Sequence, residues 1–367
     1  MPKCHAAETF VNASLAPAAV VPRSALERMP KWLICVPLTL QWLWLALRHG
    51  SSTLPSVANP AITAGGLVGE GKLEYFRAMG PVAQAATAVH CAIDAGLATP
   101  TMTLQQTLTN AGLAFPLIAK PDLGMCGHGV RLVADAQALD AYVSAFPAGH
   151  TIVLQEYLPH SGEAGIFYAR HPDQPQGEII GLALRHFPSV TGDGVSSMAQ
   201  LVAADPRAQR LLGRPDHECV YDGRVVPPLG QVVRLATIGS TRVGGLYRDG
   251  GRWITPALTA AIDAIARDMP DFHFGRFDVR FASLAELGQG RAFKIMEVNG
   301  AGSEAIQAWD PDTPLRTAFR TIFAKQALLF AVSAANRRRG HRPIGLLRLA
   351  QLHGMQLQLL KRYPPSN

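Results

Sequence analysis

The feature that most constrains the fold is a series of short β-prone runs that begins at Phe115 and is interrupted by helical stretches. The runs are FPLIAK, TIVLQEYL, AGIFYAR, EIIGLALRHF, FGRFDVRF and AFKIMEV, and helical patterns lie between or after them at 136–145, 197–204, 256–267 and 315–335. Such a mixture of strands and helices predicts an α+β fold. The sequence shows no repeat of roughly 20 to 50 residues, which argues against a solenoid or a propeller.

The composition indicates a large folded chain with an excess of positive charge. Of its 367 residues, 48% are apolar and 17% are charged, which excludes general disorder. The formal charge of +7 is compatible with nucleic acid, anionic lipid or an acidic ligand. Part of this charge lies in NRRRGHR, which we interpret as a solvated basic tail at 336–367. The cysteines form no C-x-x-C pair, which argues against zinc and indicates a reducing cytoplasm; they are Cys4, Cys35, Cys91, Cys126 and Cys219.

The apolar segment WLICVPLTLQWLWLAL, residues 32–47, resembles a membrane segment but is too short to be one. Spanning a bilayer takes roughly 20 apolar residues, and Pro37 and Gln41 interrupt this segment. We therefore expect a buried strand and helix here. A contact with a membrane surface stays open as the alternative, because aromatic residues favour the bilayer interface; the candidates are Trp32, Trp42 and Trp44.

The segment GGLVGEGKL contains part of a phosphate-binding signature. Residues 66–72 match G-x-x-x-x-G-K, but Leu73 stands where a P-loop has the Ser or Thr that binds Mg²⁺. Asn59, Pro60 and Gly65 lie ahead of the match, so no β-prone run leads into it. We reject the P-loop interpretation and leave open whether Lys72 faces a ligand.

A second glycine-rich segment, FPLIAKPDLGMCGHGVRLV, is the stronger candidate for a phosphate site. A β-prone run ends at Lys120, and a loop with three glycines leads into the next run. Glycines let backbone N–H groups approach an anion, and a lysine adds a positive charge for a phosphate oxygen. The predicted phosphate-binding residues are Lys120, Gly124, Gly127 and Gly129.

Two further segments offer polar groups to a nucleotide. After the run VLQE we expect a strand edge at 156–158 whose backbone bonds an adenine ring, followed by Glu163, whose carboxylate accepts from ribose hydroxyls. An ordinary hairpin with an exposed Glu163 is the alternative. In TGDG, Asp193 precedes a helical run, so it either caps the chain there or marks a phosphate site, and we favour the cap.

The segments GRFDVRF and KIMEVNGAG carry the predicted metal site. Side chains two apart in a strand share a face, so Glu297 and Asn299 point the same way. By the same period, Arg276, Asp278 and Arg280 share a face. The intervening ASLAELGQGRA lets the two strands turn back on each other as a hairpin. Because Mg²⁺ takes oxygen donors, we predict metal ligation by Asp278, Glu297 and Asn299.

The order of these segments resembles the ATP-grasp superfamily, and within it D-alanine–D-alanine ligase and related carboxylate-amine ligases. GRFDV and MEVNG are similar to that family's Arg-x-Asp and Glu-x-Asn segments, and TGDG is similar to a loop in the ATP-grasp part of cyanophycin synthetase. The resemblance covers residues 115–305.

The resemblance implies an α+β ATP-grasp fold in which two α/β subdomains, at about 101–160 and 161–335, clamp ATP. A smaller N-terminal α/β domain at 31–100 would precede them, and the Ala/Pro-rich residues 1–30 are expected to be poorly ordered. The implied ATP contacts are Lys120, the loop Gly124–Gly129, Gln155, Glu156, Leu158 and Glu163. Two Mg²⁺ or Mn²⁺ ions would be held by Asp278, Glu297 and Asn299, and Arg276 would stabilise an acyl-phosphate and a tetrahedral intermediate.

Two departures from the family leave the substrates undetermined. Gln155 stands where these ligases usually have a glutamate, and GAGSEAI replaces their Ser/Pro-rich substrate loop. We expect a cytoplasmic enzyme that uses ATP to join a small carboxylate to an amine, with no nucleic-acid partner. A kinase acting on a small molecule, and a non-catalytic nucleotide-binding protein at a membrane surface, are the alternatives.

Overall fold

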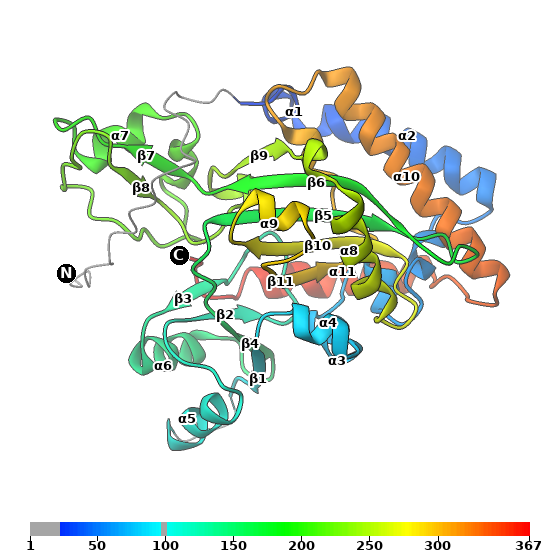
Figure 1. Cartoon of the computed structure of the whole chain (residues 1–367), viewed down its shortest axis with the longest axis horizontal. Coiled ribbons are helices and arrows are strands. Elements are labelled where there is room, and N and C mark those ends of the chain that lie inside the picture. Colours follow the sequence, from blue (N-terminus) through cyan, green and yellow to red (C-terminus); the bar gives the residue numbers. More distant parts are fainter. Residues whose placement is uncertain (1–22, 97–100) are drawn as a thin grey trace.

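The computed structural model describes residues 23–96 and 101–367, and two antiparallel sheets form its framework (Figure 1). The larger sheet has the strand order β11-β10-β5-β6-β9 and the smaller one the order β1-β4-β2-β3, while β7 and β8 form a separate ribbon. The strands are β1 (His90–Asp94), β2 (Leu117–Pro121), β3 (Arg131–Val133), β4 (Thr151–Glu156), β5 (Gly162–Ala169), β6 (Glu178–His186), β7 (Ser189–Thr191), β8 (Val232–Arg234), β9 (Leu246–Asp249), β10 (Phe274–Phe281) and β11 (Phe293–Asn299).

Helices pack on both sheets, so the α+β class predicted from the sequence is confirmed. The helices are α1 (Ala25–Arg28), α2 (Lys31–His49), α3 (Lys72–Arg77), α4 (Pro81–Ala86), α5 (Thr101–Asn110), α6 (Ala136–Ala145), α7 (Met198–Ala204), α8 (Pro256–Arg267), α9 (Leu284–Gly288), α10 (Leu315–Arg338) and α11 (Leu346–Leu360). Short 3₁₀ turns include η1 (Leu54–Val57) and η2 (Thr63–Gly66). The smaller sheet, with α5 and α6 beside it, lies below the larger sheet in Figure 1.

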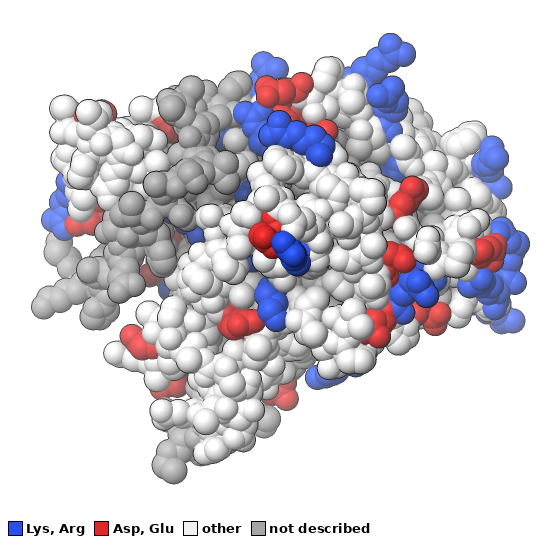
Figure 2. All heavy atoms as spheres, in the orientation of Figure 1, with Lys and Arg blue, Asp and Glu red and all other residues white. Residues whose placement is uncertain are grey.

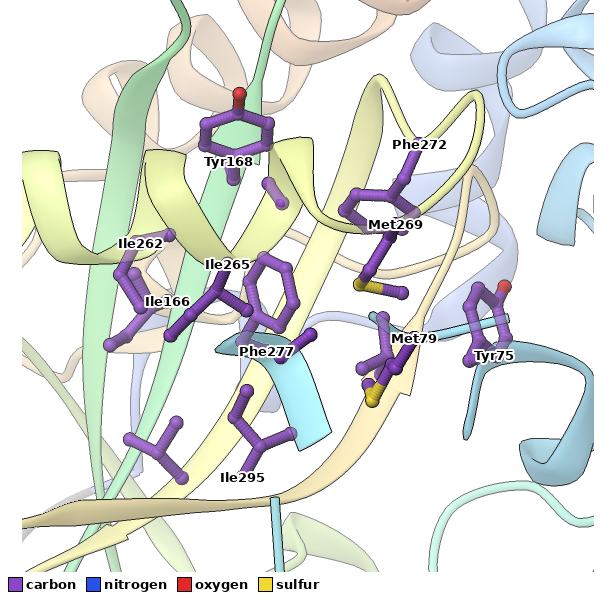
Figure 3. Close-up of a cluster of buried hydrophobic side chains, with 14 of the residues drawn as sticks. Tyr75, Met79, Ile166, Tyr168, Ile262, Ile265, Met269, Phe272, Phe277 and Ile295 are labelled. Atoms are coloured by element: carbon purple, nitrogen blue, oxygen red, sulfur yellow. The ribbon is translucent and has the colours of Figure 1, made fainter. Parts of the chain in front are cut away.

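The largest hydrophobic core lies between α8 and one face of the larger sheet (Figure 3). Ile262 and Ile265 of α8 pack with Ile166 of β5 and with Phe277 and Val279 of β10. Burying each such side chain fully contributes roughly 1.5–3 kcal/mol. Since alternate side chains of a strand point to opposite faces, this burial directs the polar residues of β10 away from α8.

A β-bulge in β11 sets the direction of its polar side chains. Asp278 pairs with Glu297, and the register then shifts so that Met296 is an extra residue on β11. Such a residue interrupts the strict alternation of faces. Ile295 and Val298 can therefore both be buried in the core although they are three residues apart, and Glu297 remains on the polar face.

The expected disorder of residues 1–30 is wrong for the part that the structure describes, residues 23–30. Ser24 caps α1 with a capping box completed by Glu27, and Leu26 is buried. Glu27 also accepts hydrogen bonds from Arg207, which joins this segment to a distant part of the chain. Residues 1–22 lie outside the described residues.

The expected N-terminal α/β domain at 31–100 is not a separate unit. Residues 31–89, all of them described, contain helices and turns but no strand, and β1 pairs with β4 of the smaller sheet. Helix α2 packs along α10, and α3 and α4 contact β11. The reason is that these helices bury their apolar residues against the larger sheet and α10 and form no core of their own.

The apolar segment at 32–47 is one helix, α2, and the expectation of a buried strand and helix is wrong. Its inner face packs on α10, where Trp42 makes an edge contact with Phe330 at 5.0 Å between ring centroids. The opposite face has no such partner among the described residues, and Trp32 is 68% exposed. Helix α2 is apolar on all sides, but only one of its sides is buried.

The expected solvated tail at 336–367 is also wrong. Helix α10 continues to Arg338, and α11 follows with Leu352 and Leu359 buried. The last residues are fixed by hydrogen bonds, including one from the Ser366 backbone N–H to Asp216 O at 3.1 Å. The basic run at 336–342 therefore forms the end of α10 and the start of its connection to α11.

In the part of the chain that the structure describes, α10 is the helix that is long and apolar enough to cross a membrane. Its residues Phe330 and Val332 are fully buried, and Leu329 packs with Phe274 of β10. We therefore interpret α10 as a helix that packs on the rest of the protein mainly through its second half.

Candidate active site

The three predicted metal ligands lie together where β10 and β11 run side by side. In the register of this pair, Asp278 is opposite Glu297 and Arg276 is opposite Asn299. Asn299 Nδ2 donates a hydrogen bond to Asp278 Oδ2 at 3.3 Å, and Asp278 is 2% exposed. The structure thus brings these side chains to one face, while their role as metal ligands stays a prediction.

Two arginines bind the Asp278 carboxylate. Arg276 donates from Nε to Oδ1 at 2.5 Å and from a terminal nitrogen to Oδ2 at 2.9 Å, the fork geometry that suits a carboxylate. Arg185 of β6 lies 3.2 Å from Oδ2. Sequence reasoning missed Arg185, although a charged residue inside the apolar run EIIGLALRHF was an available signal.

Two lysines flank Glu297 from the other side of the site. Lys72 Nζ lies 3.3 Å from Glu297 Oε1. Lys120 Nζ donates to the carbonyl of Met296 at 2.8 Å, which places it beside the same strand. Burial opposes ionisation of Glu297, but the charges of Lys72, Lys120 and Arg276 outweigh it and hold its pKa below the usual value.

Lys120 itself is buried, and burial lowers its pKa to about 7. Its charge is supported by Gln155 Oε1, which accepts a hydrogen bond at 2.7 Å. Gln155 is therefore engaged with the lysine in this structure, and its contact with ATP stays a prediction. An anion bound beside Lys120 would raise the lysine pKa again.

The loop at 63–71 positions Lys72, and its close packing explains why the loop is rich in glycine. Gly66 has φ +77°, and a Cβ there would lie 2.6 Å from Gly300 Cα. The Gly302 N–H donates to the Gly66 carbonyl at 2.6 Å, so the loop packs on the chain just after β11. This loop is no P-loop, as predicted, yet the Lys72 that ends the partial signature enters the site.

The strand edge predicted at 156–158 is not free at Glu156. Strand β4 lies between β1 and β2, so it is an inner strand. The Glu156 N–H donates to the Val89 carbonyl at 2.9 Å, and its carboxylate accepts from the Val89 N–H at 2.8 Å. A free strand edge at Glu156 is therefore wrong, and Leu158 follows the strand as a buried residue.

Glu163 is held by two arginines. Its carboxylate is 3.1 Å from Arg185 through Oε1 and 3.1 Å from Arg280 through Oε2. Glu163 is buried, so the alternative of an exposed hairpin residue is wrong, while its contact with ribose stays a prediction. Two guanidinium groups hold both oxygens because β5 lies between β6 and β10.

The charges of this face favour a polyanionic ligand. Carboxylates and cations alternate across the polar face of the larger sheet and the adjoining part of the smaller one, and the cations outnumber the carboxylates. The carboxylates are Glu163, Asp278 and Glu297, and the cations are Lys72, Lys120, Arg185, Arg276 and Arg280. A group such as a triphosphate would balance this excess and could draw the lysines and arginines away from the carboxylates.

The glycine loop between β2 and β3 lies over this face. Gly127 and Gly129 have φ +75° and +71°, which favours glycine at both positions. At Gly124 an added Cβ would lie 2.9 Å from Lys72 Nζ, so glycine allows the lysine to approach. Carbonyls of the loop are bound by distant residues: Arg242 bonds Cys126 and Gly127, Gln356 bonds Gly124, and Tyr363 bonds Leu123.

A cavity of about 870 Å³ adjoins the network at Glu163 and Arg185. Its wall also includes Tyr157 from the segment after β4, together with Phe187 and Phe281. This volume lies in the range of roughly 300–1,000 Å³ typical of small-molecule sites. Asp278 and Glu297 are not part of its wall, so the cavity extends away from the predicted metal ligands.

The donor set at the hairpin suits magnesium. No group of three His, Cys, Asp or Glu side chains within residues 23–96 and 101–367 is placed to hold a metal. The predicted set is instead two carboxylates and one carboxamide, all hard oxygen donors of the kind that Mg²⁺ takes together with water and phosphate. Asp278 and Glu297 already face cationic groups in this structure, so a divalent cation fits their chemistry.

The TGDG segment forms a capped turn. Asp193 accepts hydrogen bonds from the backbone N–H of Val195 and of Ser196, at 2.9 and 2.6 Å. A hydrogen bond from the Ser196 hydroxyl, together with these two backbone bonds, lowers the pKa of Asp193 to about 2. The favoured interpretation of Asp193 as the cap of the following helix is wrong, because the N-cap of α7 is Ser197 and Asp193 caps only the turn before it.

Comparison with known proteins finds structural likeness only. No protein-family model matches the chain, and no curated protein does. Solved structures that are similar include a bifunctional glutathione synthetase from Pasteurella multocida (17% identity, TM-score 0.38, 72% of this chain and 38% of that one). Others are the VanG D-Ala:D-Ser ligase from Enterococcus faecalis (13%, 0.38, 72% and 61%) and the D-alanine–D-alanine ligase from Bacillus anthracis (13%, 0.40, 74% and 69%). The chain thus spans less than two thirds of the first two proteins.

Proposed function

We propose that this protein is an ATP- and Mg²⁺-dependent ligase that activates a carboxylate as an acyl-phosphate and joins it to an amine. The observation that carries the proposal is the pairing of Asp278 with Glu297 on adjacent strands, with Asn299 beside them and Lys72 and Lys120 against Glu297. Oxygen ligands and phosphate-binding cations meet at one place, which is what transfer of a γ-phosphoryl group requires.

The residues of the chain divide the work as follows. Asp278, Glu297 and Asn299 would hold magnesium, which supplies charge neutralisation on the transferring phosphoryl group. Lys72 and Lys120 bind phosphate oxygens in place of their present partners. The exchange of protein partners for phosphate oxygens needs only small movements of the two lysine side chains, because both already lie beside β11.

The arginines act on the acyl group. Arg276 points its guanidinium into the site from β10, where it can stabilise the charge of an acyl-phosphate and of the tetrahedral intermediate formed by the amine. Arg185 joins Glu163 to Asp278 and therefore fixes the carboxylate that Arg276 also binds.

The cavity that begins at Glu163 and Arg185 has room for the base and ribose of ATP, with the phosphates of ATP directed toward β11.

Trapping the activated intermediate tests this proposal. The protein is incubated with ATP, Mg²⁺ and pooled carboxylic acids, with hydroxylamine as the acceptor amine. Formation of a hydroxamate together with ADP is the expected result. A stable phosphorylated product that hydroxylamine does not capture would show a kinase instead, and the Glu297→Gln variant is the inactive control for both products.

A further inference from the structure

The outward face of α2 carries large apolar side chains from one end of the helix to the other. The exposed fractions range from 41% at Leu33 to 83% at Leu47. The exposed large side chains of this face are Trp32, Leu33, Val36, Leu40, Leu43, Trp44 and Leu47. With 3.6 residues per turn they fall on one side of the helix, opposite Ile34 and Leu45, which are buried with α10. We call these seven residues the α2 apolar face.

This face is unusual because α2 has no acidic residue, while its ends are basic. Lys31 begins the helix, and Arg48 and His49 end it. Helix α10 runs alongside, so its final residues Arg337 and Arg338 come to the same end as Arg48. Figure 2 shows Lys and Arg side chains gathered at that end of the molecule.

The positions of the tryptophans add a second signal. Trp32 lies in the first turn of α2 and Trp44 near its end, with the Arg48 guanidinium 5.5 Å from the Trp44 ring centroid. Tryptophan favours the boundary between headgroups and acyl chains, and arginine favours anionic headgroups. Trp42, by contrast, is turned inward, and its Nε1 donates to the Ser52 carbonyl at 3.1 Å.

We propose that the α2 apolar face binds the surface of an anionic lipid bilayer, with α2 lying in the plane of the interface. The apolar side chains enter the acyl boundary, and the basic ends of α2 and α10 contact anionic headgroups. A second copy of this chain is the less suitable occupant. In a twofold dimer the face would meet itself, and its cations would find no acidic residue on the facing helix.

Vesicle binding by the full chain tests the proposal. Cosedimentation is measured with phosphatidylcholine vesicles and with vesicles in which roughly a third of the lipid is phosphatidylserine. We expect binding to the anionic vesicles about tenfold tighter or more, and loss of that difference at high salt. No binding to anionic vesicles, or equal binding to both compositions, overturns the proposal.

Substitutions distinguish binding through the α2 apolar face from nonspecific binding of the protein to vesicles. Leu40→Glu and Leu47→Glu should each weaken vesicle binding about tenfold or more, because they place a charge on the buried side of an interfacial helix. Leu229→Glu is the matched control, since Leu229 is 82% exposed but lies far from α2 in sequence, between β7 and β8. Equal loss in the control overturns the proposal, as does a dimer in solution that Leu40→Glu dissociates.

Quenching of tryptophan fluorescence keeps the test decisive if a glutamate variant fails to fold. Brominated anionic lipid should quench the unmodified protein, and Trp32→Phe combined with Trp44→Phe should remove most of that quenching. Quenching that persists in the double variant would place another part of the molecule at the bilayer and overturn the assignment to α2.

Discussion

The β10–β11 hairpin was expected to bind magnesium and the segment from Gln155 to Glu163 was expected to bind ATP, and the surroundings of their side chains could be predicted to different degrees. In the hairpin, side chains point where a period of two places them, and Asp278 meets Glu297 across the strands. In the other segment, Gln155 binds Lys120 and Glu163 is held by two arginines. Direction along one strand follows from local geometry, whereas the partner of a side chain depends on neighbours that come from distant sequence.

The largest expected effect is at Glu297. Glu297→Gln removes a charge that we assign to metal binding and should lower kcat by roughly a hundredfold or more, with a much smaller effect on ATP affinity. Steady-state kinetics and a nucleotide-binding titration give the two numbers. Asn299→Asp keeps an oxygen ligand and should show only a partial defect. If both variants turn over normally and only lose thermal stability, the hairpin is structural.

The lysines should come next in size, because each supports binding of phosphate. Lys72→Met should weaken ATP binding by roughly tenfold, since one charge-assisted contact is lost. Lys294→Met is the matched control, because Lys294 lies on β11 with Glu297 but its Nζ donates to the Ala85 carbonyl at 2.8 Å. Equal ATP affinity of the Lys72 variant and the unmodified protein would remove Lys72 from the phosphate site.

The Gln155–Glu163 segment should respond in stability more than in catalysis. Glu163→Gln leaves Arg280 buried without its carboxylate partner and Arg185 with Asp278 alone, so we expect a loss of about 3–5 kcal/mol in the free energy of unfolding. Chemical denaturation measures it. A specific rise in KM for ATP without loss of stability would contradict this expectation and support the predicted ribose contact.

The smallest expected effect is a proton taken up when ATP binds. Free Lys120 has a pKa of about 7, so much of it is neutral at pH 8, and phosphate should raise this pKa and draw a proton in. Calorimetry in buffers of different ionisation enthalpy measures the uptake. Lys120→Met should remove it, whereas Glu70→Gln serves as a control for the nearby carboxyl, whose pKa burial raises to about 7.

The same pKa has a consequence for stability, with a defined sign. Between pH 7 and the ordinary lysine value, the unfolded chain binds more protons at Lys120 than the folded one. This residue therefore makes the protein more stable as pH rises through that range. A Lys120→Met variant should lack that part of the pH dependence of unfolding.

Sequence reasoning predicted the α+β class, the hairpin and the loop at 124–129, because strand period and glycine pattern are local properties. It left the role of Lys72 open and missed Arg185, because these residues reach the site only through packing of the loop at 63–71 on Gly300 and of β6 beside β5. It also misread residues 23–30 and 336–367. Apolar composition alone could not show that α2 would bury one side only, nor that α11 would pack against the glycine loop.

The central claim is that magnesium and the phosphates of ATP meet at the Asp278–Glu297 pair. A crystal structure with Mn²⁺ and a non-hydrolysable ATP analogue tests it most directly, because Mn²⁺ can be located by its anomalous scattering. We expect a metal at roughly 2.0–2.2 Å from carboxylate oxygens of Asp278 and Glu297, with Lys72 and Lys120 turned to phosphate oxygens. A nucleotide bound elsewhere, or a metal with both carboxylates still paired to Arg276 and Lys72, would contradict the claim.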